Sequence, residues 1–167
     1  MKLLIVYYSQ TGNTEKVAKR IFYALPNVEK ALKKINEIDY EQIKNWDIIF
    51  LGSPVHIHTL PKKVKVFFKK IPRDYHLNIA LFITYGVQLE QFYKGAIDIT
   101  EYYCKNFSLN FLGAYHCLGK HNNLKELSKI FPDKVDWVRK TSEGHPDESD
   151  LKKAEDWALK IFEEVKK

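Results

Sequence analysis

The residues best suited to bind a ligand lie near the N-terminus, between an apolar run and an amphipathic helical pattern. The loop there is Ser9-Gln10-Thr11-Gly12-Asn13-Thr14. Backbone N–H groups converge at the start of a helix, and the helix dipole favours an anion at that end. The hydroxyls of Ser9, Thr11 and Thr14 and the amide of Asn13 add side-chain donors, and Gly12 lets the backbone turn close to a ligand. The loop therefore predicts binding of a phosphate monoester.

This loop differs from the two common nucleotide motifs. It has no Gly-x-x-x-x-Gly-Lys-Ser/Thr pattern, which disfavours a nucleoside-triphosphate site, and no Gly-x-Gly-x-x-Gly, which disfavours a dinucleotide site. It also contains no Lys or Arg. Neutral donors suit a resident phosphorylated cofactor better than a phosphoryl group in transfer.

Two histidines, His56 and His58, are the other residues that could do chemistry in a loop. They have no nearby carboxylate or cysteine to complete a metal site, so we predict no bound metal. Ordinary polar loop residues are one interpretation of the pair, and residues that tune a bound cofactor are another. The two cysteines, Cys104 and Cys117, are not spaced as a redox or metal pair, and we interpret them as packing residues. No catalytic constellation is evident.

The elements that must position these loops follow from hydrophobic periodicity. Short apolar runs predict strands, and apolar residues at helical spacing predict helices. The expected strands cover residues 2–8, 28–38, 47–53, 78–84 and 107–117. In the second, Val28, Leu32 and Ile35 would also fit one face of a helix, but its many lysines suit a strand at a sheet edge. The expected helices cover residues 14–25, 40–45, 61–71, 89–103, 124–130 and a segment from about 147, with Asp147 as N-cap. In the fifth strand Phe107, Leu109, Phe111, Gly113, Tyr115 and Cys117 alternate.

Strands that alternate with helices predict an α/β fold, an open and doubly wound five-stranded parallel sheet with helices on both faces. The 167 residues suit a single domain spanning 1–167. No apolar run is long enough for an integral membrane segment, and no signal peptide is recognisable. Reduced cysteines fit a reducing compartment, so we expect a cytoplasmic protein.

The loop and its setting resemble the flavodoxin family. Ser9–Thr14 resembles the signature Ser/Thr-x-Thr-Gly-x-Thr, and Phe50–Pro54 resembles the third strand and the start of the second flavin loop. Residues 83–86 sit where the third flavin loop should begin, and Gly144–Glu148 resembles a subgroup of small stand-alone members. The resemblance covers essentially the whole chain. It implies a flavodoxin-like strand order of 2-1-3-4-5 and FMN at the switch point between strands 1 and 3.

The resemblance also implies which residues bind FMN. Phosphate binding is assigned to Ser9, Gln10, Thr11, Gly12, Asn13 and Thr14. The isoalloxazine ring is expected to lie between Pro54, Val55, His56 and Ile57 on one side and Thr84, Tyr85, Gly86 and Val87 on the other. Tyr85 is the stacking candidate, because an aromatic face suits a flat ring. The chain departs from many flavodoxins in lacking a Trp in the second loop and a Gly-Asp pair in the third. Few acids and two histidines near the ring predict a midpoint potential less negative than in acidic flavodoxins.

The net charge of the chain indicates what kind of partner it could bind. The formal net charge is +6, whereas the usual flavodoxin is acidic. The lysines on the helix after the second flavin loop are Lys62, Lys63, Lys65, Lys69 and Lys70. They form either a solvated face or a docking site for an acidic redox partner or an anionic membrane. No nucleic-acid motif accompanies the charge, so we expect no nucleic-acid partner.

Residues 118–146 form an extra segment after the fifth strand. Either Phe131 and Trp137 anchor it to the core, or it partly covers the flavin ring. The predicted function is electron transfer between redox partner proteins through non-covalent FMN. The alternative is an FMN-dependent oxidoreductase acting on a quinone, a tetrapyrrole or another small molecule, since this size and charge resemble menaquinone-linked protoporphyrinogen oxidases. A module that has lost its flavin is disfavoured by the intact phosphate loop.

Overall fold

The computed structural model describes all residues 1–167, and its centre is one parallel sheet. The strands are β1 (Lys2–Tyr7), β2 (Glu29–Lys34), β3 (Ile48–Pro54), β4 (Asn78–Tyr85) and β5 (Asn110–Leu118). Their order is β2-β1-β3-β4-β5, and every neighbouring pair is parallel. The predicted fold class is confirmed, and the Lys-rich β2 lies at the sheet edge, where its charges discourage pairing with another chain.

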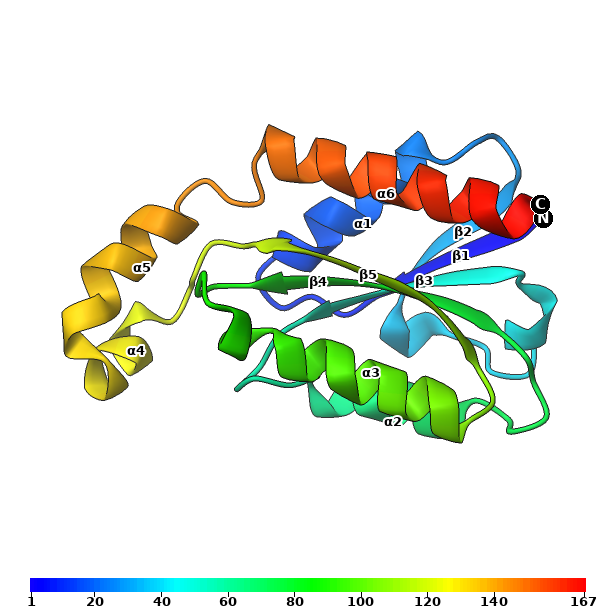
Figure 1. The fold of residues 1–167 in the computed structure, drawn as a ribbon, viewed down its shortest axis with the longest axis horizontal. Helices are drawn as coiled ribbons and strands as arrows, with labels where there is room; N and C mark the ends of the chain where they lie inside the picture. The colour runs from blue at the N-terminus through cyan, green and yellow to red at the C-terminus, as the bar shows by residue number, and fades with distance from the viewer.

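Helices cover both faces of the sheet (Figure 1). The helices α1 (Asn13–Ala24) and α6 (Glu148–Lys166) bury one apolar cluster, which includes Val17, Ile21, Leu151 and Ile161. The helices α2 (Lys62–Lys70) and α3 (Lys94–Asn106) bury the other, which includes Val64, Phe67, Phe68 and Tyr103. The central strands are apolar on both faces because both faces are covered.

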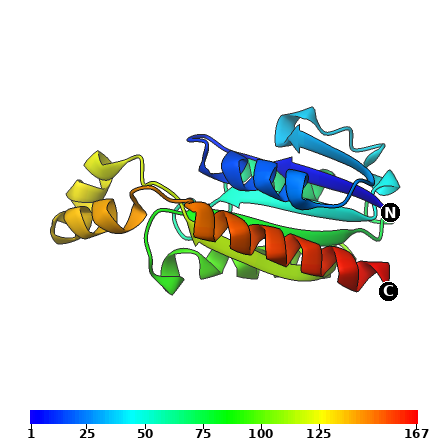
Figure 2. The same ribbon diagram turned by 90° about the horizontal axis from the view of Figure 1, so that it is seen from above.

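A pair of short helices, α4 (Leu124–Ile130) and α5 (Val135–Ser142), projects beyond the carboxyl ends of the strands, on the left of Figures 1 and 2. The pair is joined by a 3₁₀ turn at Pro132–Lys134. A small apolar cluster of Val87, Leu127 and Val138 joins it to the loop after β4. We call residues 118–146 the cap. None of the helices combines the length and the apolarity that a bilayer crossing requires.

Several predicted elements have different bounds. The expected helix at 40–45 is wrong, because only a 3₁₀ turn at Ile43–Asn45 forms there. The second strand is followed by a 3₁₀ turn at Ile35–Glu37, and another 3₁₀ turn at Glu90–Phe92 precedes α3. Pro61 is the residue before α2 and not its first residue. The sequence pattern missed α5, whereas Asp147 is the N-cap of α6 as predicted.

The side chains of the fifth strand do not alternate between the two faces of the sheet without interruption, although the sequence pattern predicts that they do. Phe111 pairs with Ile79, but Gly113 pairs with the next residue, Ala80, so Leu112 is an extra residue in a bulge. Phe111 packs on the α2/α3 face and Leu112 on the α1/α6 face. A bulge changes which face the following residues occupy, and Gly113 (φ 112°) supplies the left-handed backbone that permits it. As a result Phe111 and Tyr115 lie on opposite faces of the sheet.

Candidate functional site

The three predicted flavin loops lie together because all five strands end at the same edge of the sheet. A pocket of about 510 Å³ lies between these loops and the cap. Its lining residues are Gln10, Thr11, Asn13, Pro54, Val55, His56, Ile57, Thr84, Tyr85, Gly86, Lys120, His121, Asn122, Asn123, Glu126, Leu127 and Ile130. Of the predicted site residues, only Ser9, Gly12, Thr14 and Val87 lie outside this lining.

The loop from Ser9 to Thr14 presents unpaired donors at the start of α1. Gly12 precedes the helix with φ 91°, and its N–H donates to Ser9 Oγ at 3.1 Å. The backbone N–H groups of Gln10, Thr11, Asn13, Thr14 and Glu15 have no acceptor within the protein. Unpaired amides and the positive end of the helix dipole together favour a bound anion.

Thr14 behaves differently from the other hydroxyl residues of the loop. Its side chain is buried, and its Oγ1 lies 2.8 Å from Oγ1 of Thr84 at the end of β4. The hydroxyl predicted to face a phosphate is therefore paired with a residue of the third loop. The Thr14 hydroxyl holds the phosphate loop against the third loop. Only the backbone N–H of Thr14 is left to donate to an anion.

The second loop is a tight turn. The backbone N–H of His56 donates to the carbonyl oxygen of Thr59 at 2.9 Å, and the N–H of Thr59 donates to the carbonyl oxygen of His56 at 3.0 Å. Ile57 and His58 have φ of 46° and 62°, which is unusual for residues with a Cβ, above all for a β-branched one. Ile57 is 92% exposed at the tip of the turn. Such backbone strain is often held at ligand-binding loops.

The two histidines of this loop point to different places. His56 lines the pocket, and burial lowers the pKa of its imidazole, so it is neutral near pH 7. His58 turns away, where its Nδ1 lies 2.8 Å from the carbonyl oxygen of Gln91 and its ring packs on Phe92. The pair does not converge as two ligands of one metal.

Tyr85 lines the pocket, but one side of its ring is already covered. The ring stacks on Tyr93 at a centroid distance of 4.5 Å, and its hydroxyl lies 3.1 Å from Nδ1 of His116. Burial raises the pKa of the phenol, which therefore stays protonated. Val87 is buried against the cap and does not line the pocket.

The cap supplies the side of the pocket that the sequence analysis did not assign to residues. His121 packs so closely on Gly86 that a Cβ at that glycine would lie 2.5 Å from the imidazole Cδ2. Its Nδ1 accepts from the N–H of Asn123 at 3.3 Å, and burial lowers its pKa. Asn13 of the phosphate loop donates through Nδ2 to the carbonyl oxygen of Lys120 at 3.0 Å. The cap thus contacts the phosphate loop and the third loop.

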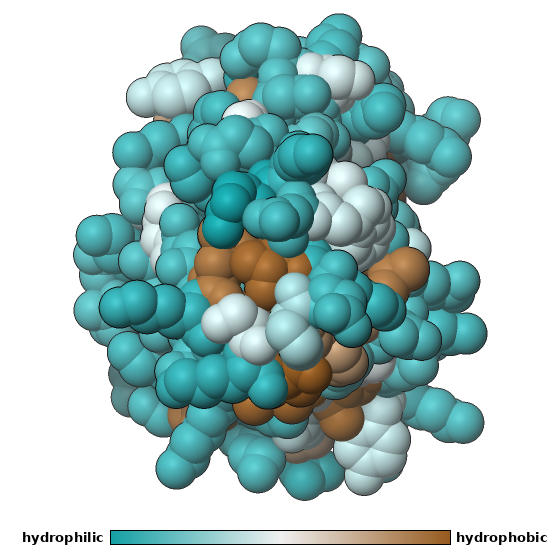
Figure 3. All heavy atoms as spheres, turned by 90° about the vertical axis from the view of Figure 1, so that its left-hand side faces the viewer, coloured by the Kyte–Doolittle hydropathy of each residue, from teal (hydrophilic) through white to brown (hydrophobic).

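Phe131 and Trp137, predicted as possible anchors of the cap, are only partly buried, although the Phe131 ring meets that of Phe92 edge-on at a centroid distance of 6.5 Å. Each is 39% exposed, whereas Leu127 and Val138 are the buried residues that join the cap to Val87. Figure 3, which looks onto this end of the molecule, shows apolar atoms gathered near its centre with hydrophilic side chains around them. Ile130 of the cap lines the pocket and is largely exposed, so part of this apolar surface lies beside the pocket.

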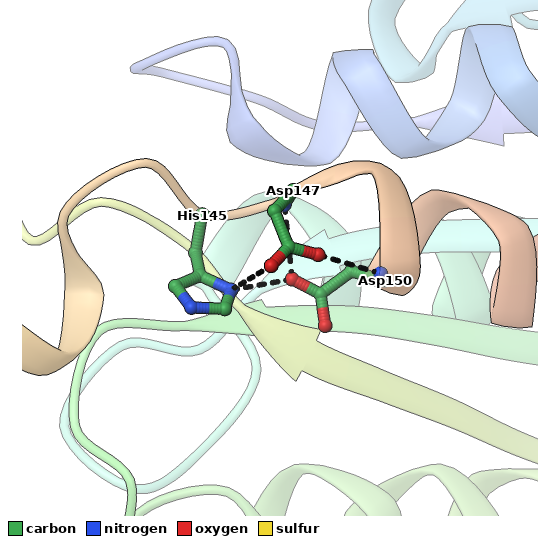
Figure 4. A group of neighbouring side chains, drawn as sticks. All are labelled: His145, Asp147 and Asp150. Carbon is green, nitrogen blue, oxygen red and sulfur yellow. Dashed lines mark hydrogen bonds and ion pairs between the residues drawn. The ribbon is translucent and has the colours of Figure 1, made fainter.

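A cluster of His145, Asp147 and Asp150 lies where the cap joins α6 (Figure 4). Asp147 Oδ1 accepts from the N–H of Asp150 at 2.9 Å, and Asp150 Oδ2 accepts from the N–H of Asp147 at 3.0 Å. His145 Nδ1 lies 2.5 Å from the same Asp150 oxygen. These carboxylates form a capping box for α6, which accounts for the cluster without a metal ion.

Cys104 and Cys117 are free, buried and on different elements. Burial raises the pKa of each thiol to about 12, so both stay protonated and unreactive. Their interpretation as packing residues agrees with this placement.

Comparison with known proteins agrees with this geometry. A family model described as a flavodoxin domain matches residues 4–158. A Clostridioides difficile protein named flavodoxin-like domain-containing protein BilS is 34% identical over 180 aligned positions, which cover 97% of each chain. An uncharacterized protein of Methanocaldococcus jannaschii is 29% identical, with 97% of this chain and 99% of that protein covered.

Solved structures give the same fold. A flavodoxin from the domain Archaea superposes with a TM-score of 0.70 at 17% identity, and the match covers 100% of both chains. Oxidised flavodoxin 1 from Bacillus cereus superposes with a TM-score of 0.69 at 16% identity, over 98% of each chain. The family-model match extends over nearly the whole sequence and includes all three loops at the pocket. The chain belongs to the flavodoxin family, whose cofactor is FMN.

Proposed function

We propose that this protein shuttles electrons between redox partner proteins through a single non-covalently bound FMN. The observation that carries this proposal is the set of unpaired backbone N–H groups in the phosphate loop, at one end of the pocket. Five such donors at a helix N-terminus suit an anionic acceptor with several oxygens, and a phosphate monoester provides three. Bound FMN would accept and donate one or two electrons, which the side chains cannot do.

The remaining residues fit the flavin ring by shape and polarity. In this assignment Pro54, Val55, His56 and Ile57 flank one side of the ring, and Thr84, Tyr85 and Gly86 the other, with Val87 supporting the third loop from behind. His121 adds a second flat side chain to the pocket, and its neutral Nε2–H is free to donate. No nucleophile or general acid is needed for electron transfer, so we assign no catalytic residue. The reduced thiols favour a cytoplasmic location.

A flavin titration tests the proposal. FMN is added to apo-protein, with riboflavin as the phosphate-free control, and quenching of flavin fluorescence is followed. We expect FMN to bind at least about a hundredfold more tightly, because the loop amides make charge-assisted hydrogen bonds only with the phosphate. Thr11→Ala should weaken FMN binding and leave riboflavin binding nearly unchanged. Equal binding of both flavins, or no binding, would refute the proposal.

A second candidate function is an FMN-dependent oxidoreductase acting on a quinone, a tetrapyrrole or another small molecule. The observation that favours it is the cap side of the pocket, where Leu127 and Ile130 give apolar contacts and Asn122 and Asn123 give amides. A bare electron carrier does not require such a wall. Sustained turnover with a reduced nicotinamide as two-electron donor and a soluble quinone as acceptor would support an enzyme. Reduction of the flavin by the nicotinamide without steady turnover would favour the electron carrier over the enzyme.

A further inference from the structure

The excess positive charge of the molecule is concentrated in one segment. Residues 55–73 contain six of the 27 Lys and Arg residues and none of the 21 Asp and Glu residues. The six are Lys62, Lys63, Lys65, Lys69, Lys70 and Arg73. The rest of the chain therefore has equal numbers of basic and acidic side chains. The whole net charge of +6 lies on α2 and the turn that follows it.

These lysines are not neutralised by the fold. None of the five lysines of α2 forms an ion pair, although the acidic residues of the segment 35–45 lie on a neighbouring loop: Glu37, Asp39 and Glu41. Lys63 lies over the ring of Tyr8 and Lys70 over the ring of Tyr40, each at 5.3 Å. The ammonium groups at both ends of the helix therefore face solvent or an aromatic ring.

The position of Lys62 and Lys63 disfavours the helix. They occupy the first turn of α2, which contains no acidic residue, and the helix dipole repels cations at this end. Lys69 and Lys70 occupy the last turn, where the dipole favours cations. Helix stability explains the second pair of lysines and not the first. Residues that break a local rule are often retained for function.

The first turn of α2 is also the part of the helix nearest the pocket. Residues 54–57 line the pocket, and four further residues connect them to the start of the helix. Lys63 lines a smaller cavity of about 210 Å³ together with Ser9 of the phosphate loop. At the pocket mouth Ile57 is 92% exposed and Ile130 of the cap is 67% exposed. Exposed apolar residues with a charged rim are the usual anatomy of a transient protein interface.

We infer that the first turn of α2 and the pocket mouth form a docking face for an acidic electron-transfer protein. The carboxylates of such a partner would meet Lys62 and Lys63, while Ile57 and Ile130 would contact apolar surface beside its redox centre. A membrane fits less well, since the large exposed apolar side chains include none from α2, and a helix that lies on a bilayer needs an apolar face turned to it. This inference rests on the proposed function, because it assumes that FMN occupies the pocket.

The helix provides a matched pair of variants. Lys62→Glu/Lys63→Glu and Lys69→Glu/Lys70→Glu change the net charge equally, and each reverses one lysine that lies over a tyrosine ring. The two sites are about 10 Å apart along the helix axis. That exceeds the screening length of about 8 Å at about 150 mM salt, so local and long-range charge effects can be separated. Thermal melting checks that both variants fold.

Electron transfer from a reduced, acidic plant-type ferredoxin to the FMN-loaded protein is followed by stopped flow at about 150 mM salt. Each reduced cluster gives one electron, and the flavin absorbance reports its arrival. We expect Lys62→Glu/Lys63→Glu to slow the second-order reaction by about tenfold or more, and Lys69→Glu/Lys70→Glu by less than about threefold. The basic protein cytochrome c, as acceptor from the reduced protein, should show no such loss with the first variant.

Three results would overturn the inference. Equal losses in both variants would mean that only net charge matters, and no loss in either would remove the docking face. Sedimentation with phosphatidylserine vesicles that depends on Lys62 and Lys63, with unchanged ferredoxin rates, would point to a membrane. Failure of the wild-type protein to bind FMN would instead refute the proposed function, so the two failures are distinguishable.

Discussion

The hydroxyl oxygens of Thr14 and Thr84 lie 2.8 Å apart, and both side chains are almost completely buried. Thr14 belongs to the first turn of α1 and Thr84 to the end of β4, 70 residues later. The pair joins the loop that presents amides to a phosphate with the loop that flanks the proposed ring site. Each hydroxyl has the other as its hydrogen-bond partner beneath the pocket surface, so the pair ties the two loops together.

Thr84→Val tests this connection. Valine keeps the shape of threonine but leaves the buried hydroxyl of Thr14 without its partner, which costs about 1–3 kcal/mol. We expect the free energy of unfolding of the apo-protein to fall by that amount in urea titrations, and FMN affinity to fall as well. Thr84→Ser is the control, because it keeps the oxygen and should lose much less. A Thr84→Val protein as stable as wild type would show that the contact does not stabilise the site.

Gly86→Ala tests the contact between the cap and the third loop. The new Cβ would lie 2.5 Å from Cδ2 of His121, a separation that forces the imidazole or the cap to move. We expect weaker riboflavin binding, since riboflavin senses the ring site without the phosphate. Adding His121→Ala removes the nearest imidazole atoms and should restore part of the binding, although His121 Cβ would still be 3.1 Å from the new methyl. Riboflavin affinity unchanged in Gly86→Ala would place His121 outside the ring site.

Much of the fold could be predicted from the sequence because its signals are local. The phosphate loop combines residue types that suit a helix N-terminus, and lysines in β2 suited an edge strand. The carboxyl ends of parallel strands must meet, so the three loops had to share one end of the sheet. The strand order came from the family resemblance and not from the residues themselves.

The parts that could not be predicted depend on contacts between distant residues. Val87 was assigned to the ring site because of its place in the loop, but the cap buries it against Leu127 and Val138. His121 reaches the pocket only because residues 118–146 fold back on Gly86. The apolar alternation of β5 gave no sign of the bulge at Leu112, which places Tyr115 on the face opposite to Phe111. Thr14 likewise matches the phosphate signature, although its hydroxyl is paired with Thr84.

Asp147→Ala and Asp147→Asn test the capping box of α6. Asp147 accepts the N–H of Asp150, and this backbone hydrogen bond lowers the pKa of its carboxyl. Alanine removes the acceptor and should lower the Tm, whereas asparagine keeps an acceptor and should be close to wild type near pH 7. A wild-type Tm in the alanine variant would show that the Asp147 side chain contributes nothing to the stability of α6.

The same carboxyl gives a pH dependence with a defined sign. Its folded-state pKa lies below the unfolded value of about 3.9, so its stabilisation is present above that pH. The stabilisation is lost as the pH falls through the folded-state pKa. We therefore expect any advantage of wild type over Asp147→Asn in urea unfolding to disappear as the pH falls below about 4. An advantage that grows on acidification would contradict this assignment.

The midpoint potential of the bound flavin should respond to Glu126, the one acidic side chain that lines the pocket. Reduced FMN tends to carry negative charge, and a nearby carboxylate disfavours it, although Lys129 partly neutralises Glu126 through a 2.7 Å contact. Lys120 also lines the pocket but is paired with Glu143 at 2.8 Å, and the two histidines of the lining are neutral. Because the pocket carries no unpaired carboxylate, we expect a potential less negative than in acidic flavodoxins. Glu126→Gln should raise it further, on the order of tens of millivolts. Asp133→Asn, which removes an acid of the cap outside the pocket, is the matched control. Spectroelectrochemical titration at pH 7 measures all three proteins, and a wild-type potential as low as that of acidic flavodoxins would show that the pocket charges do not set it.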